Sequence, residues 1–173
     1  DNTACGPSIG GLRMAPDVAI VGEVRDREAL PLLLTLSSGV KGFTTIHAAN
    51  ARGALSRVRF LAELSESARN LPHSALTTLV ADAVDIVVFS QRTPSGPEVT
   101  EVLAVEDLAG NPETGAFTVT DLYDRSGPDR ALAWTGNVPM RLGARFASSG
   151  EDLLALLHGG EVSRQWLASP FRR

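Results

Sequence analysis

The sequence has little of several residue types on which folds and sites often depend. Its 173 residues include one cysteine, Cys5, which excludes an internal disulfide and leaves too few thiolates for a structural zinc site. No apolar run reaches the roughly 20 residues of a membrane-spanning helix. The chain opens on Asp1 rather than Met and shows no signal-peptide pattern. We therefore expect a fragment from a reducing, cytoplasmic setting without a transmembrane segment.

Lysine is almost absent as well. The 16 basic side chains comprise fifteen arginines and Lys41, and 20 acidic ones bring the net charge to -4. This balance argues against direct nucleic-acid binding. Nucleotide phosphates are commonly held by a glycine-rich loop that ends in Gly-Lys-Ser/Thr. Because Lys41 is followed by Gly42-Phe43, the chain contains no such loop, known as Walker A.

The hydrophobic pattern alternates between strands and helices over the first half of the chain. Continuous apolar runs predict strands at 18–21, 42–46 and 85–89, and the first and third of these are expected to be buried on both faces. Between them we expect a helix capped by Asp26 and ended by Gly39, with Pro31 causing a kink or a later start. Two more helices are expected, one after the cap Asn50 and one near Pro72.

The second half of the chain has a different hydrophobic pattern. Residues 99–105 and 115–122 alternate as an antiparallel strand pair, residues 125–149 show little periodicity, and 151–157 predict a short helix. The expected fold is thus α/β, with a mainly parallel sheet flanked by helices and an antiparallel β appendage. We place the domain boundary between residues 1–92 and 93–173.

Two polar side chains follow neighbouring strands. Glu23 comes after the strand at 18–21 and His47 after the next strand, 24 positions later. Because ligands of open α/β sheets bind at the carboxyl ends of the strands, Glu23 is a candidate to bind magnesium or activate water, and His47 can reach a phosphate oxygen. Gly22 is expected to let the backbone turn there. The alternative is that Glu23 and Arg25 only solvate a strand end.

Other charged residues carry weaker hypotheses. Arg57 and Arg59 lie on the polar side of the helix after Asn50, where they either face solvent or offer a guanidinium to phosphate. His73 and His158 are interpreted as surface residues at helix ends.

Two segments together resemble a known family. LRMAPDVAIVGEVRD, at residues 12–26, and GFTTIHAANARGALSR, at residues 42–57, resemble the Walker B segment and histidine box of the secretion-superfamily ATPases. These are hexameric RecA-like (P-loop NTPase) motors, and the Flp/Tad pilus assembly members show the greatest likeness. The likeness covers roughly residues 9–108. It departs at Ala15, Val40 and Ala49, where the family usually has arginine, histidine and asparagine.

The resemblance implies roles for named residues. Glu23 would be the Walker B glutamate that orders magnesium or activates water, and His47 would sense the γ-phosphate of ATP. Arg25, Thr45 and Arg57 would be secondary nucleotide contacts, and Thr45 would act together with Thr44 by supporting the strand that carries His47. The parent protein would then form a ring, a hexamer, with Mg²⁺ and ATP as cofactors. It would work with membrane platform proteins at the inner face of the plasma membrane.

Three functions remain open from the sequence. The first is a part of an ATP-hydrolysing motor for pilus assembly or type II/IV secretion, inactive alone because it lacks the Walker A loop. The second is a truncated, non-catalytic interaction module of such a system. The third, and weakest, is a non-nucleotide hydrolase that uses Glu23 and His47 as an acid-base pair.

Overall fold

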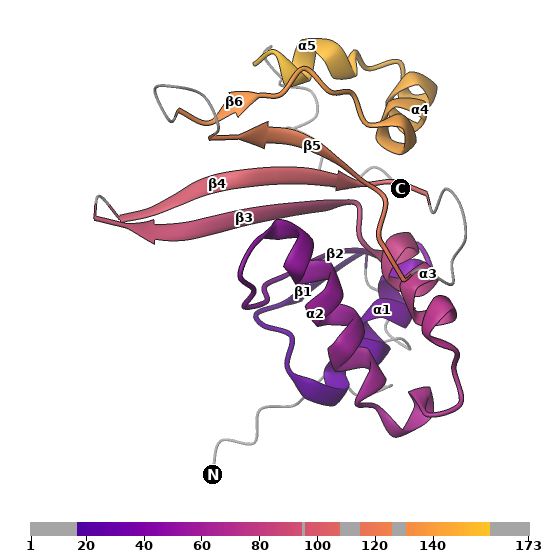
Figure 1. Ribbon diagram of the computed structural model, residues 1–173. Coiled ribbons are helices and arrows are strands. Elements are labelled where there is room, and N and C mark those ends of the chain that lie inside the picture. The colour runs from indigo at the N-terminus through magenta and orange to yellow at the C-terminus, as the bar shows by residue number, and fades with distance from the viewer. Residues whose placement is uncertain (1–16, 95, 108–114, 126–130, 160–173) are drawn as a thin grey trace.

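The computed structural model describes residues 17–94, 96–107, 115–125 and 131–159 (Figure 1). Of the sequence features above, Cys5 and residues 12–16 of the first motif lie outside these ranges. In chain order the elements are β1 (Val18–Val21), η2 (Asp26–Glu28), α1 (Ala29–Ser37), β2 (Lys41–Thr44), α2 (Ala51–Glu63), η3 (Glu66–Ala68), α3 (His73–Ala83), β3 (Ile86–Thr93), β4 (Gly96–Val105), β5 (Val119–Asp124), β6 (Ala133–Trp134), α4 (Met140–Ser149) and α5 (Leu153–Leu157).

Local signals account for most helix ends. Asn50 caps α2, since its side chain accepts a hydrogen bond from the Gly53 amide at 2.6 Å. Gly39 follows α1 with a φ of +97°, as a left-handed C-terminal cap requires. The predicted cap at Asp26 is wrong, because Asp26 lies inside the turn η2 and α1 begins only at Ala29. The late start places Pro31 in the first turn, where its missing N–H costs no hydrogen bond.

The strands form two separate sheets. β1 and β2 make a two-stranded parallel sheet, and the other four strands make an antiparallel sheet in the order β3-β4-β5-β6. The expectation of a mainly parallel sheet is therefore wrong for the described residues. The reason lies in β3, which pairs with β4 from Ile86 opposite Ala104 to Thr93 opposite Gly96 instead of joining β1 and β2. The predicted antiparallel pairing of β4 with β5 is confirmed.

One face of β1 and β3 is open. Val18 and Ile20 are 40% and 78% exposed, and Ile86 and Val88 are 45% and 59% exposed. The prediction that these strands are buried on both faces is thus wrong, because α1, α2 and α3 pack on the other side of both strands and leave these side chains exposed. On that side, Val21 contacts the main core together with residues of β3.

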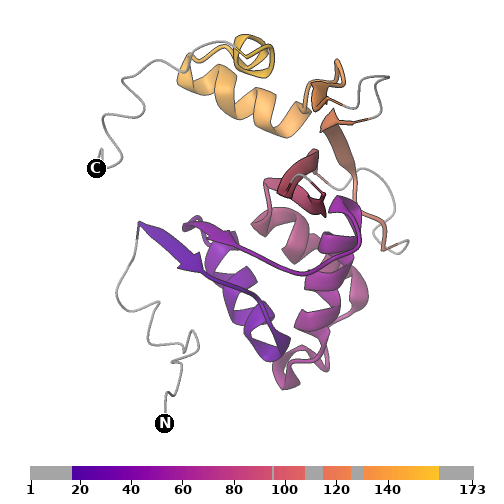
Figure 2. The same cartoon turned by 90° about the vertical axis from the view of Figure 1, so that its left-hand side faces the viewer.

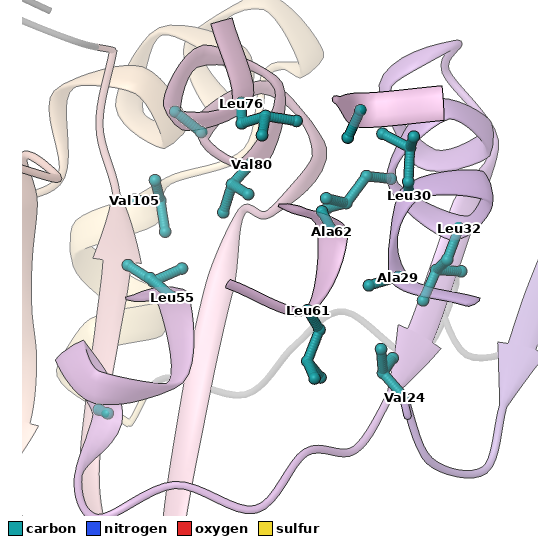
Figure 3. Packing of buried hydrophobic residues seen from close by; sticks show 14 of the residues in the cluster. Val24, Ala29, Leu30, Leu32, Leu55, Leu61, Ala62, Leu76, Val80 and Val105 are labelled. Atoms are coloured by element: carbon teal, nitrogen blue, oxygen red, sulfur yellow. The ribbon is translucent and has the colours of Figure 1, made fainter. Parts of the chain in front are cut away.

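The main core lies between the three helices α1, α2 and α3 and the strands (Figures 1 and 3). Its largest fully buried side chains are Leu33, Leu55, Leu76, Val80, Leu103 and Val105. Two of them, Leu103 and Val105, come from β4, so the antiparallel sheet packs against the same helices as β1 and β2. Figure 2 shows these helices below the helix α4, with the antiparallel strands between them. The domain boundary at residue 92 stays a prediction.

A second, smaller cluster lies on the opposite face of the antiparallel sheet. Leu122, Leu142 and Leu157 pack there with Ala104. Its helix α4 falls in the segment 125–149, where the sequence shows little periodicity. Long-range contacts hold α4. Glu106 accepts hydrogen bonds from the first amides of the helix, Arg141 donates to carbonyl groups at the end of α3, and both Arg141 and Arg145 pair with Asp85. No helix in the described part of the chain has the length and hydrophobicity to cross a membrane.

Candidate functional site

The carboxyl ends of β1 and β2 bring Glu23 and His47 together. The strands are parallel and in register, with Val21 opposite Thr44, so the loops that follow them emerge at the same edge. His47 Nε2 lies 3.4 Å from Glu23 Oε1. The Glu23 side chain is 27% exposed and the His47 side chain is 95% exposed. An acceptor and an imidazole thus lie side by side on an open surface, where a ligand can reach both.

Arg25 contacts the other oxygen of the Glu23 carboxylate. Its guanidinium donates a hydrogen bond to Glu23 Oε2. This bond holds the pKa of Glu23 below its usual value; desolvation acts in the opposite direction, and the charges of Arg25 and His47 lower it further. The pKa of Arg25 is raised in return. Glu23 is therefore an anion at neutral pH, the form that binds a cation or accepts a proton from water.

Hydrogen bonds join the two loops that follow β1 and β2. The Val24 amide donates to the Thr45 carbonyl at 2.9 Å, which extends the β1–β2 pairing past the strands. The Thr45 hydroxyl donates to the Gly22 carbonyl, and Val24 is buried at 3% exposure. Thr45 therefore supports the loops rather than facing the open site. The expected role of Gly22 is not needed, because its φ is not in the left-handed region and a Cβ there would meet nothing within 4 Å.

Arg57 and Arg59 of α2 have different surroundings. Arg59 donates to Thr77 Oγ1 at 3.0 Å and to the Gly115 carbonyl, and its guanidinium lies 5.1 Å from the centre of the Phe117 ring. Arg59 is thus a structural residue. Arg57 is exposed over the Phe60 ring, and within the described chain it forms no ion pair with Glu23. The structure does not bring Arg57 to the site.

Sequence reasoning missed the contacts at the start of α2, the helix that follows His47. Glu101 of β4 accepts from the Ala51 amide at 3.1 Å, and Arg52 pairs with Asp121 of β5 at 2.5 Å. Asn50 Oδ1 accepts a hydrogen bond from the Gly53 amide, so amide groups at the start of α2 already have oxygen acceptors. No sequence signal pointed to Glu101, because a carboxylate on a strand does not show which helix it faces.

The side chains present limit which metal ion this site can bind. Among the residues that the structure describes, no three histidine, cysteine or acidic side chains gather as a metal site. Mg²⁺ bound with a nucleotide needs only one or two protein carboxylates, because phosphates and water supply the other ligands. Glu23 fits that requirement, and the same site does not fit a structural zinc ion.

Comparisons with known proteins agree with the motifs. The sequence model of the family "Type II/IV secretion system protein" matches residues 10–95. Over those residues the chain is similar to that family. Glu23, Arg25, Thr45 and His47 all lie within the matched segment, and so does Arg57. The family therefore covers β1 to β3, whereas β4 to α5 lie beyond the match.

The relatives within this family include conjugation and type IV secretion proteins. The probable conjugal transfer protein TrbB of Sinorhizobium fredii is 37% identical over 99 residues, which is 57% of this chain and 29% of TrbB. The type IV secretion system protein PtlH of Bordetella pertussis is 39% identical over 82 residues, 47% of this chain and 24% of PtlH. The chain thus spans less than a third of the length of these relatives.

A solved structure is similar to about half of this chain. The VirB11 ATPase from the Brucella suis type IV secretion system, crystallised with sulphate, matches with a TM-score of 0.51 and 26% identity. The match covers 53% of this chain and 29% of that chain. This chain is homologous to VirB11-family secretion ATPases and has a mixed α/β fold that corresponds to part of one.

Proposed function

We propose that this chain supplies the Walker B and histidine-box part of a RecA-like ATPase that powers a type II/IV secretion or pilus assembly system. The observation that carries the proposal is the Glu23–His47 pair, 3.4 Å apart at the carboxyl ends of two parallel strands. The family match over both motifs supports the reaction class. The third hypothesis, a hydrolase that acts without a nucleotide, has no such support.

Each site residue has a proposed role. Glu23 orders the attacking water or binds the magnesium ion that ATP brings, and that ion would neutralise phosphate charge. His47 donates a hydrogen bond to a phosphate oxygen. Arg25 holds the Glu23 carboxylate through its hydrogen bond, and Thr45 holds the two loops together. Arg57 is proposed to contact ATP from an interface between subunits, since within the described chain it has no ion pair with Glu23.

The rest of the reaction needs groups from elsewhere. The sequence contains no Gly-Lys-Ser or Gly-Lys-Thr. Positioning and charge neutralisation are nearly all of phosphoryl-transfer catalysis, so the chain alone is proposed to be inactive. A Walker A loop would come from polypeptide that this chain does not include. In the same proposal the assembled enzyme is a hexameric ring at the cytoplasmic face of the inner membrane, where it contacts platform proteins.

Which transport system the protein serves is the finer part of the proposal. The pilus assignment rests on the likeness of the motifs to the Flp/Tad ATPases. The TrbB and PtlH relatives favour conjugation or type IV protein secretion just as well. A non-catalytic interaction module stays the second candidate, favoured by the missing Gly-Lys-Ser/Thr loop.

A chimaera tests the proposed ATPase role. Residues 10–95 of this chain replace the matched segment of TrbB, and ATP turnover and ATP binding are measured on the product. We expect Glu23→Gln to reduce turnover by on the order of a hundredfold while ATP still binds, because one charge-stabilising group is worth about that much. Glu66→Gln, at an exposed position, is the matched control. Equal turnover in the two variants would remove the assigned role, and turnover absent even without mutation would favour the interaction module.

A further inference from the structure

The loop that carries His47 is attached to the rest of the fold mainly at its two ends. At the first end, Thr45 makes two hydrogen bonds with the loop after β1, and Ile46 packs against the main core. Among the described residues, the backbone groups of 46–49 form no hydrogen bond with another backbone group. The His47 side chain is 95% exposed, so packing contributes little to its position. Its place beside Glu23 therefore depends on how the second end of the loop is held.

The second end of the loop is the start of α2, and the antiparallel sheet holds it. Glu101 of β4 accepts a hydrogen bond from the Ala51 amide at 3.1 Å. Ala51 is fully buried, and an amide in the first turn of a helix has no partner within its own helix. Without Glu101 this buried donor would lose its acceptor, which is costly. A carboxylate at this position also interacts favourably with the dipole of the helix.

The strand register directs Glu101 and Asp121 toward α2. Glu101 and Leu103 are two positions apart on β4, so they share a face, and Leu103 packs in the main core with the helices. Leu103 lies opposite Asp121 of β5. Asp121 pairs with Arg52 of α2 at 2.5 Å, but the two side chains are 49% and 57% exposed, so this ion pair contributes less than the Glu101 contact. Two strands thus contact successive residues of α2, which reaches the antiparallel sheet in Figure 1.

We propose that Glu101 is a positioning residue for His47 and that Asp121 assists it. By fixing the start of α2, the two carboxylates hold the imidazole beside the carboxylate of Glu23. Both lie beyond residues 10–95, so the family match assigns them no role. The second half of the chain then acts on the site that the first half carries. The proposal rests on the proposed function for its catalytic meaning, but the geometry that it concerns can be measured without ATP.

NMR of the full chain tests this positioning. The chain has three histidines, and His47→Gln assigns the imidazole signal of His47. At one fixed pH, Glu23→Gln should shift the Cε1–Hε1 signal of His47, because the two side chains lie 3.4 Å apart. In the Glu101→Ala background this shift should fall to about half or less, since doubling a separation halves a Coulomb interaction. Asp121→Asn should cause a smaller reduction.

Three control variants separate positioning from a general loss of structure, and circular dichroism checks that each is folded. Glu101→Gln keeps an acceptor oxygen at the same reach and should retain the full shift. Glu101→Asp keeps the charge but shortens the reach to the Ala51 amide, so it should lose part of the shift; it replaces the alanine variant if that variant does not fold. Glu98→Ala removes a carboxylate of the same strand that pairs with Arg125 at 3.2 Å, and it should leave the shift unchanged.

Four results would overturn the inference. They are a full shift in folded Glu101→Ala, an equal reduction by Glu98→Ala, a reduced shift in Glu101→Gln, and no effect of Glu23→Gln on His47 in the otherwise unchanged chain. The last result would also remove the observation that carries the proposed function. By contrast, absent ATP turnover in the TrbB chimaera, with these shifts as expected, would overturn the proposed function and leave the positioning of His47 intact.

Discussion

Glu106 offers the sharpest test of how the carboxyl-terminal helices are attached. Its carboxylate is buried at 8% exposure and accepts three hydrogen bonds: from Thr120 Oγ1 at 2.7 Å, the Met140 amide at 3.1 Å and the Arg141 amide at 2.9 Å. The residue that precedes α4, Pro139, has no side-chain donor or acceptor for this purpose. A glutamate directly after β4 thus acts as the N-terminal cap of a helix more than thirty residues later.

Replacing Glu106 with alanine leaves three donors without their acceptor. Hydrogen bonds to charged groups are worth about 1.5–3 kcal/mol each, but bonds that share one acceptor do not add. Loss of a helix cap alone costs about 1 kcal/mol. We therefore expect Glu106→Ala to lower the free energy of unfolding by about 3 kcal/mol. For a chain of this size that corresponds to a fall in Tm of about 9 °C.

Urea unfolding followed by circular dichroism measures this loss. Glu106→Gln keeps one acceptor oxygen and should cost about 1 kcal/mol. Asp107→Ala is the control, because its side chain is 85% exposed and lies 4.0 Å from Arg141, which makes an ion pair of small value. A cost for Glu106→Ala below about 1 kcal/mol, or equal to that of Asp107→Ala, would refute the capping role.

Three further predictions follow from single contacts. Arg25→Gln should raise the pKa of Glu23 toward its ordinary value, seen by NMR titration of its carboxyl carbon. Because the folded-state pKa of Glu23 is lowered, the Glu23–Arg25 pair stabilises the fold above the unfolded-state pKa of Glu23, and this stabilisation is lost as the pH falls through the folded-state pKa. An unchanged Glu23 pKa in Arg25→Gln would show that Arg25 does not lower it. Gly42→Ala should destabilise the fold by about 1–3 kcal/mol, because its Cβ would lie 2.3 Å from Leu36 Cδ2 and 2.9 Å from the Ala19 carbonyl oxygen. Gly22→Ala is the control and should be nearly neutral, since its Cβ would meet nothing within 4 Å. Thermal unfolding of both variants measures the difference. Arg59→Ala should cost about 2 kcal/mol and Arg57→Ala under about 0.5 kcal/mol, and equal costs in urea titration would show that the Thr77 and Gly115 contacts do not hold α2.

The local features of the fold were predictable because each depends on neighbours in the chain. Asn50 caps the helix that follows it, and Gly39 ends the helix before it, through contacts within a few residues. The alternation at 99–105 likewise predicts a strand that pairs in antiparallel fashion with the next one. Asp26 shows the limit of such signals, since a cap residue with an ordinary preference lies inside a turn with a φ of +44°.

The contacts that assemble the site and the appendage could not be predicted in the same way. Glu101 reaches the start of α2 from fifty residues away, and Arg59 reaches Gly115 over a similar separation. A sequence pattern shows that these side chains are polar, but their partners depend on how the sheets pack. The helix α4 was missed for a related reason, because its cap comes from Glu106 rather than from a residue beside it.

The sequence by itself determined the family motifs, the order of strands and helices in the first ninety residues, and the candidate pair Glu23 and His47. These follow from residue type and spacing, which the chain carries wherever it folds. Only the tertiary structure decided that Arg25 holds the Glu23 carboxylate, that β3 leaves the parallel sheet for a hairpin with β4, and that an apolar face remains open. Those outcomes depend on which surfaces meet, because burial and pairing are properties of the assembled chain rather than of any one segment.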